Sequence, residues 1–366
     1  MLDTFSQIFI HVAMGLYVIA FIAFALDLAR RSARATIPGA VKSAASRRAA
    51  PAEDLVFVEA GAVQSETVAA VGGSGQATAT VVAPVATAGG GGGGTGPVAR
   101  LTSRLEEDTH NGRAKSTSLR VAMVLTIVAW VLHLCADVLR GLAAGRVPWA
   151  NMWEFSMTAT LIIVGIFLVA NLWSDLRYLG TFVLGFVCLV LMLATTVYYV
   201  PVVPLPPALQ SYWLVIHILV AMLGTAFFAL SFGLSVAQLL QVRREHRVQQ
   251  ELPTNLRFLG TLPGSVTLEN LAYRVTIVGF ICWTFTLIAG AIWAEKAWGA
   301  YWTWDTKEVW TFIVWVIYAG YIHARATRGW RGSRSAWLAI IGFAAVLFNF
   351  GIVNVFFKGL HTYSGL

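Results

Sequence analysis

Charged residues are scarce in this chain. Asp, Glu, Lys and Arg make up 12% of its 366 residues, whereas about a quarter of the residues of soluble domains are charged. Hydrophobic residues account for 57%, and the mean hydropathy is +0.70. This composition excludes an ordinary soluble domain. We expect an all-α polytopic membrane protein surrounded by membrane lipid.

Cysteine is also scarce, and its spacing excludes several classes of protein. Cys135, Cys188 and Cys282 lie in separate apolar runs and form no Cys-x-x-Cys pair. A disulfide-stapled fold and a dithiol oxidoreductase are therefore excluded, and without Cys-x-x-Cys-His the chain is not itself a c-type cytochrome. We interpret the three cysteines as packing residues.

The start of the chain lacks the basic segment and cleavage site of a signal peptide. Its first apolar run is long enough to cross a membrane, which takes about 20 residues. We therefore expect a retained first transmembrane helix. Adding the later apolar runs gives about eight predicted spans: 5–28, 119–139, 152–173, 179–199, 212–238, 271–293, 309–323 and 336–356.

The positive charges indicate how these spans are oriented. Alternate threading puts both termini on the outer face, and only five of the 26 lysines and arginines then lie outside: Arg140, Arg146, Lys296, Lys307 and Lys358. Such a bias follows the positive-inside rule. It explains the net charge of +8 without nucleic acid as a partner.

A long segment after the first span has a different composition. Residues 30–118 are rich in Ala, Gly, Ser, Thr and Pro and include the glycines 89–94. Such a segment cannot bury enough apolar surface to offset its ordering entropy, so we expect a disordered cytoplasmic loop. The predicted organisation is a first transmembrane helix (1–29), this linker (30–118) and a seven-helix membrane domain (119–366).

Aromatic residues crowd into one short segment, 293–310, between two apolar runs. It holds five tryptophans and Tyr301 together with several charged residues. An aromatic belt at the membrane surface is the simplest interpretation, but a belt puts one or two rings at each helix end. A concentrated set of rings instead suits a planar apolar ligand with a polar edge. With His217 and His361 predicted on the same side, that ligand is haem, whose iron commonly takes imidazole ligands.

The sequence of this segment resembles a known family. The residues are Trp298-Gly299-Ala-Tyr301-Trp302-Thr-Trp304-Asp305-Thr306-Lys307-Glu308-Val-Trp310, followed by His323 and by Gly359-Leu360-His361. They resemble the tryptophan-rich WWD signature of haem-handling proteins, and within that group the CcsA (ResC-type) family of System II cytochrome c synthase subunits. The resemblance covers about 119–366. One departure is Thr306, where many members have proline, and no candidate ligand is lost by it.

The resemblance implies a set of site residues. Haem b would lie against Trp298, Trp302 and Trp304 with its iron between His217 and His361. His323, about 22 Å deeper along its helix, would bind haem near its point of entry. Its partner ligand is attributed in the family to a CcsB/ResB-type subunit, with His133 a weaker candidate in this chain. Further residues assigned to the haem site are Tyr301, Asp305 and Trp310.

The resemblance also implies a reaction and a location. The thiols of an apocytochrome c Cys-x-x-Cys-His motif, kept reduced by a thiol reductant protein, would add to the haem vinyl groups. The reaction would take place on the extracytoplasmic side of the plasma membrane. The chain would then be a subunit of a cytochrome c synthase. The alternatives are a haem-presenting protein without synthase activity, a membrane haem electron carrier, and a transporter or scaffold with an aromatic rim.

Overall fold

The structure is a computed structural model that describes residues 1–34, 116–204, 210–253, 257–327 and 330–361, and nearly all of the predicted linker lies outside them. The regular structure of these residues is entirely helical. The long helices are α1 (Leu2–Arg34), α4 (Thr117–Ala144), α5 (Met152–Trp173), α6 (Gly180–Val197), α7 (Tyr212–Gln249), α8 (Ser265–Trp298), α9 (Thr306–Ala326) and α10 (Ser333–Phe348). Shorter elements are η1 (Arg177–Leu179), η3 (Arg257–Thr261), a π-helical turn η4 (Asn349–Val353) and α11 (Asn354–Phe356).

The predicted all-α membrane fold is confirmed. Each of the eight predicted spans falls on a helix. Seven of the described helices are long and apolar enough to cross a membrane. The helix outside that set is α9, whose 21 residues include Lys307, Glu308, His323 and Arg325. It packs against α8 and α10, so it belongs to the same bundle.

The helices differ from the predicted spans in two informative ways. Helix α7 continues to Gln249, beyond the predicted end at Gln238, because a polar sequence such as 239–249 can remain helical after it leaves the apolar layer. The predicted last span, 336–356, is interrupted: α10 ends at Phe348 and the π-helical turn η4 separates it from α11. Hydropathy reports burial and carries no information on such a change of helical register.

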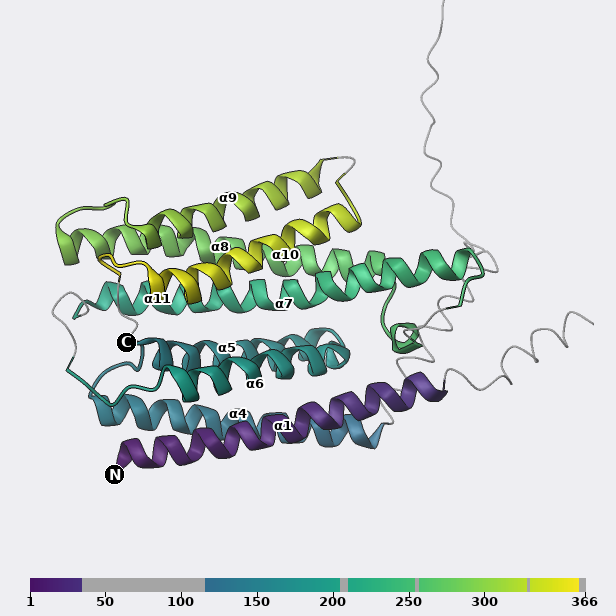
Figure 1. The fold of residues 1–366 in the computed structure, drawn as a ribbon, viewed down its shortest axis with the longest axis horizontal. Coiled ribbons are helices and arrows are strands. Elements are labelled where there is room, and N and C mark those ends of the chain that lie inside the picture. The colour runs from purple at the N-terminus through teal and green to yellow at the C-terminus, as the bar shows by residue number, and fades with distance from the viewer. Residues whose placement is uncertain (35–115, 205–209, 254–256, 328–329, 362–366) are drawn as a thin grey trace, which may run out of the picture. The chain divides into compact units, whose positions relative to one another are not determined.

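The helices form two layers. Figure 1 shows α1, α4, α5 and α6 in one layer and α7, α8, α9 and α10 in the other. Within the layers, α1 packs along α4 and α7 packs along α8, while α5 meets α7 across the boundary. The largest apolar core lies mainly in the first layer, and a second core around Phe228, Val314, Tyr318 and Phe343 lies in the other.

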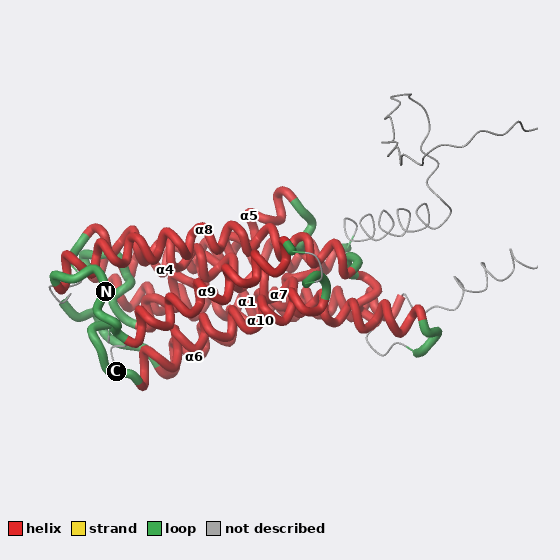
Figure 2. Tube along the Cα trace, turned by 90° about the horizontal axis from the view of Figure 1, so that it is seen from above, coloured by secondary structure: helices red, strands yellow, loops and turns green. Residues whose placement is uncertain are grey.

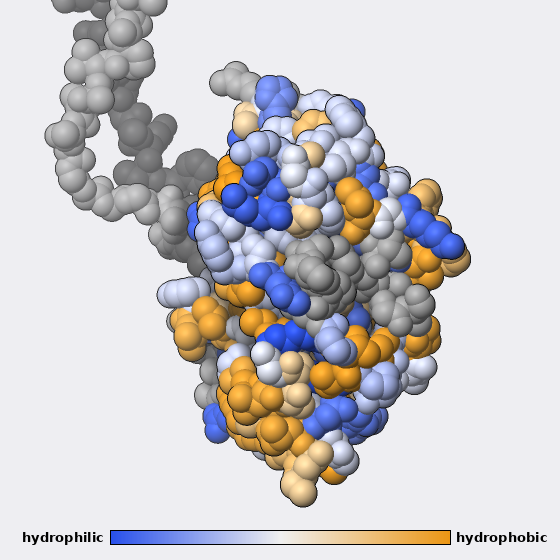
Figure 3. Space-filling model, turned by 90° about the vertical axis from the view of Figure 1, so that its left-hand side faces the viewer, coloured by the Kyte–Doolittle hydropathy of each residue, from blue (hydrophilic) through white to orange (hydrophobic). Residues whose placement is uncertain are grey.

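The connections predicted to share a face do gather at one end of the bundle. The start of α1, the end of α11 and the α8–α9 connection lie there (Figure 1), and the tube view shows loops concentrated at that end (Figure 2). Seen end-on, this face mixes polar and apolar side chains (Figure 3). The sequence therefore identified which segments meet.

A buried ion network fixes one corner of this end. Arg140 on α4 donates to Asp3 Oδ1 at 2.6 Å, to Glu154 Oε1 at 2.9 Å and to the Val200 carbonyl at 2.8 Å. Glu154 Oε2 also accepts from Arg146 at 2.8 Å and from the Ala150 amide at 2.9 Å. Arg140 and Glu154 are fully buried. The network joins α1, α4, α5 and the α4–α5 loop.

Candidate functional site

A cavity of about 240 Å³ is lined by residues of both layers and by the α4–α5 and α8–α9 loops. Its walls come from α5, α6, α7, α8, α9 and α10, with the α4–α5 loop and the C-terminal segment closing one side. Most of its lining is aliphatic or aromatic. The polar side chains that line it include His217, His361, Lys307, Asn151 and Asn349. It is an apolar chamber with a few placed polar groups, as small-molecule sites usually are.

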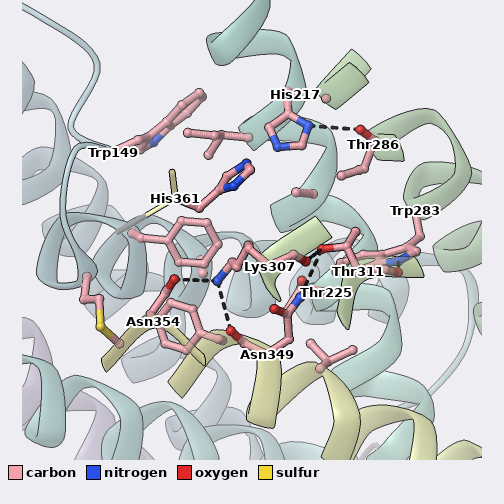
Figure 4. Close-up of a pocket in the computed structure, with 18 of the residues that line it drawn as sticks. Trp149, His217, Thr225, Trp283, Thr286, Lys307, Thr311, Asn349, Asn354 and His361 are labelled. Atoms are coloured by element: carbon pink, nitrogen blue, oxygen red, sulfur yellow. Dashed lines mark hydrogen bonds between the residues drawn. The ribbon is translucent and has the colours of Figure 1, made fainter. Parts of the chain in front are cut away.

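His217 on α7 is held by the facing helix α8. Its Nδ1 lies 3.0 Å from the Thr286 carbonyl oxygen, and since a carbonyl can only accept, Nδ1 carries the proton (Figure 4). Gly290 makes room for the ring, because a Cβ there would lie 2.8 Å from His217 Cε1. The imidazole stacks on Trp293 at 5.9 Å between ring centroids. The Nε2 lone pair is left for a ligand.

His361, in the C-terminal segment, has the same arrangement with a different partner. Its Nδ1 lies 2.7 Å from Asp305 Oδ2. Gly359 passes so close to Asp305 that a Cβ would overlap the carboxylate. Burial lowers the pKa of His361 below its ordinary value although the Asp305 hydrogen bond opposes this. The ring is therefore neutral near pH 7, with Nδ1 donating and Nε2 unprotonated.

Both imidazoles contact the same indole. The centroid of His361 lies 5.5 Å from that of Trp293 in an edge-to-face arrangement, and 4.8 Å from that of Trp298. Trp293 is almost fully buried. Figure 4 shows His217 and His361 projecting into the same cavity. The structure thus brings together the two histidines that the sequence predicted as a pair.

The loop before α9 is fixed by Glu308. Its carboxylate accepts from the Thr303 amide at 2.8 Å, the Thr303 hydroxyl at 3.1 Å and the Asp305 amide at 3.2 Å. Asp305 is the N-cap residue of α9 and is the same residue whose carboxylate holds His361. Asp305 therefore positions both the start of α9 and the His361 ring.

The predicted flat surface of three tryptophans is not present as such. Trp302 lines the cavity together with Tyr301. Trp304 has a positive φ of 60°, is 78% exposed, and its ring stands at 87° to that of Trp302. Trp298 contacts His361 and is not part of the cavity wall, and Trp310 packs on Phe348 at 4.3 Å. Trp304 is not among the residues that line the cavity.

The other two candidate ligands lie elsewhere. His323 is exposed near the far end of α9. His133 is fully buried on α4, with Nδ1 3.4 Å from the Tyr17 hydroxyl on α1. Neither lines the cavity. Arg325, beside His323, is engaged with Glu269 at 2.8 Å and with Asn270 at 2.8 Å.

Several cavity residues were missed by sequence reasoning. Trp293 was noted only as the start of the tryptophan-rich segment, and Lys307 only as an outward charge. Asn349 and Asn354 belong to the interrupted end of α10, and their signal was the occurrence of two amides in an otherwise apolar run. A π-helical turn is frequent at functional sites, but it cannot be read from hydropathy.

Comparisons with known proteins identify the family. The chain is 34% identical over 260 residues to the cytochrome c biogenesis protein CcsA of Guillardia theta, spanning 66% of this chain and 84% of that relative. It is 33% identical over 278 residues to CcsA of Microcystis aeruginosa, with 64% and 85% covered. A solved structure, the cytochrome c heme lyase CcmF, is similar with a TM-score of 0.48 and 17% identity over 68% of this chain and 44% of that one. Residues 149–361 match the family described as cytochrome C assembly protein. Together with the CcsA relatives, this match confirms the predicted resemblance: the chain belongs to the cytochrome c assembly protein family.

Proposed function

We propose that this chain holds haem b in the cavity and presents it for attachment to apocytochrome c, as the CcsA-type subunit of a System II cytochrome c synthase. One observation carries the proposal: two imidazoles line the same aromatic cavity, each with Nδ1 bound to a fixed acceptor and Nε2 left for a metal. An anchored Nδ1–H is the usual arrangement of metal-binding histidines.

The donor set fits haem and does not fit a bare metal ion. The described residues contain no group of three or more His, Cys, Asp or Glu side chains that could hold a metal. Two imidazoles therefore suit an iron that brings four equatorial ligands of its own. The cavity walls fit as well, since apolar rings and aliphatic side chains enclose most of it. This is the setting in which a largely apolar macrocycle is stable.

The family reaction assigns work to particular residues of this chain. When bound, haem supplies vinyl groups across which two cysteine thiols add, each S–H giving its sulfur and its proton to one C=C bond, so that no oxidant is consumed. Asp305 and the Thr286 carbonyl hold the two imidazoles in one tautomer. Trp293 keeps their rings in place, and the apolar walls exclude water. Holding the partners in register is the main contribution of a protein to such a reaction.

The cavity would open to the extracytoplasmic side of the plasma membrane. The positive-inside bias supports this orientation. The apocytochrome c and a thiol reductant protein would then approach the loops that surround the cavity, and residues 119–366 would form the haem-handling domain.

His323 has a separate role in the proposal. Because it is exposed on α9 and lies apart from the cavity, a CcsB/ResB-type subunit packed against α9 could supply the second imidazole there. Haem would enter at that intersubunit site and move outward to His217 and His361. His133 is enclosed beside Tyr17 and is less suited to this role.

The same placement argues against an electron carrier. A carrier needs two ligand pairs at stacked depths, and among the described residues His133 and His323 lie in different surroundings, one enclosed and one exposed. A haem-presenting protein without synthase activity would bind haem in the same way but would form no thioether product. A covalent haem stain of a Cys-x-x-Cys-His substrate after incubation with the loaded complex separates these two functions.

The decisive experiment is the visible spectrum and haem content of the chain purified with its partner subunit. His217→Ala and His361→Ala should retain part of the haem with a changed, imidazole-rescuable spectrum. His323→Ala should lose haem because entry is blocked. His246→Ala is the matched control, since this histidine is exposed on α7. A wild type without haem, or three site variants with unchanged spectra, would contradict the proposal.

A further inference from the structure

Lys307 lines the cavity but has no role in the function proposed so far. It lies in the first turn of α9. Its Nζ donates to the Asn349 carbonyl at 2.9 Å and to Asn354 Oδ1 at 2.6 Å (Figure 4). Both acceptors are neutral, and they are the first residues of η4 and α11 respectively. An ammonium has three donors, so one more hydrogen bond is available.

The nearby carboxylates do not neutralise this charge. Asp305 is committed to His361, and both oxygens of Glu308 accept from Thr303, with one also accepting from the Asp305 amide. Within the described part of the chain, no carboxylate lies within ion-pair distance of Lys307. A neutral donor could satisfy the same two acceptors without the cost of burying an unpaired charge. Burial lowers the pKa of Lys307 to about 7 although the nearby Asp305 charge opposes this, so a carboxylate placed beside Nζ would favour the charged form.

A second, independent observation points to a polar ligand group. Asn151 and Asn349 both line the cavity, with exposures of 6% and 4%. Asn151 Nδ2 and Asn349 Oδ1 have no hydrogen-bond partner among the described residues. The other end of the Asn151 amide accepts from the Glu154 amide at 2.9 Å, which fixes its orientation. Buried polar atoms without partners are rare and usually indicate a group supplied from outside.

We propose that Lys307 is an anion-binding residue that takes a carboxylate of the ligand in this cavity, with Asn151 as a neutral donor in the same chamber. The inference rests on the proposed function, in which that carboxylate is a haem propionate. It assigns an orientation, because the acidic edge of the macrocycle would face the start of α9 and the π-helical turn. An ammonium and a carboxylate form a charge-assisted hydrogen bond, which is stronger than a neutral one.

A purely structural role is the competing interpretation. Lys307 also ties α9 to η4, so its loss could loosen the C-terminal segment that carries His361. The two roles differ in one respect. A structural role affects every porphyrin equally, whereas an anion-binding role affects only a porphyrin with free carboxylates.

The test compares haem with haem dimethyl ester, which lacks the negative charges. Both are titrated into the ligand-depleted complex and followed by absorbance. Wild type should bind haem about tenfold or more tightly than the ester. Lys307→Met should lose this preference and bind the ester as wild type does, while Lys307→Arg should retain most of it. Lys296→Met, which removes an exposed lysine paired with Glu295 at the same end, should behave as wild type.

Thermal melting without ligand guards against a folding defect. If Lys307→Met does not fold, Lys307→Gln decides the question, because the amide keeps hydrogen-bond donors and removes only the charge. Equal weakening of haem and ester, or an unchanged preference, would overturn the assignment of Lys307. Equal binding of both porphyrins by wild type would overturn it while leaving haem binding intact. Binding of neither would overturn the proposed function together with the inference.

Discussion

At the scale of single residues, the site depends on how two imidazoles are held. His217 donates to a backbone carbonyl, and His361 donates to the Asp305 carboxylate. A carbonyl is neutral and a carboxylate is not, so the two rings differ in basicity. Under the proposed function, His361 would therefore be the more strongly donating of the two imidazoles.

The pKa of His361 leads to a prediction on pH. Burial lowers this pKa below its ordinary value of about 6.5. Only the neutral ring can bind iron, so haem affinity should be constant above about pH 6.5 and should fall as the pH drops through the lowered pKa. The measurement is a set of haem titrations between neutral and acidic pH. A midpoint at or above the ordinary histidine value would contradict the burial of this ring.

The close approach of Gly290 to His217 gives a second prediction. In Gly290→Ala the new methyl would lie 2.8 Å from Cε1 and would push the ring off Trp293. Haem affinity should fall roughly 10 to 100-fold, which is the usual effect of mutating a residue that orients a metal ligand. Gly233→Ala on α7 is the matched control, because no atom lies within 4 Å of the added Cβ. Its only expected effect is a gain in stability of about 0.5–1 kcal/mol. Equal haem affinity in the two variants would show that the glycine does not serve the histidine.

Single residues also show what sequence could and could not predict. His217 and His361 were found because a histidine at a helix end and a histidine after the last span must both lie at the outer end once the threading is known. Their Nδ1 partners were not found, because Thr286 acts through its backbone and any residue type could supply that carbonyl. Trp304 was misplaced since its positive φ is a property of the folded loop.

At the scale of elements, apolar runs predicted every long helix. Two features could not be read from hydropathy. The polar extension of α7 carries no apolar signal, and the π-helical turn after α10 lies in a run that stays apolar. The loop between α4 and α5 contributes Trp149, Ala150 and Asn151 to the cavity wall. Its backbone is held by Glu154, whose charge is balanced by Arg140 and Arg146.

This buried network allows a prediction on stability. Glu154→Ala would remove the buried carboxylate that Arg140 and Arg146 share, leaving Asp3 as the carboxylate partner of Arg140. Removing one member of a buried ion pair costs about 3–5 kcal/mol. Thermal and denaturant unfolding in detergent should show this loss, and the cavity wall formed by the α4–α5 loop should loosen with it. Glu295→Ala is the control, since its pair with Lys296 lies at the surface and should be nearly neutral. A Glu154 variant as stable as this control would mean that the network is not needed for folding.

At the scale of the whole molecule, the bundle has one end with the cavity and another with His323. The orientation in the membrane is predicted by the distribution of lysine and arginine. In a cysteine-free background, a membrane-impermeant thiol reagent should label Lys358→Cys in intact cells and should label Gln250→Cys only after lysis. Both residues are exposed, and they lie in the C-terminal segment and at the end of α7 respectively. The reverse pattern would place the cavity on the cytoplasmic side.

The cavity is lined by helices of both layers, so a bound molecule would connect them. Such a molecule would contact α5 and α6 in one layer and α7, α8 and α10 in the other, and would add contacts beside α6, which packs only weakly on α7. Binding to the folded state alone stabilises it in proportion to the logarithm of ligand concentration. Under the proposed function, chains made when haem is scarce would therefore be less stable and more readily degraded.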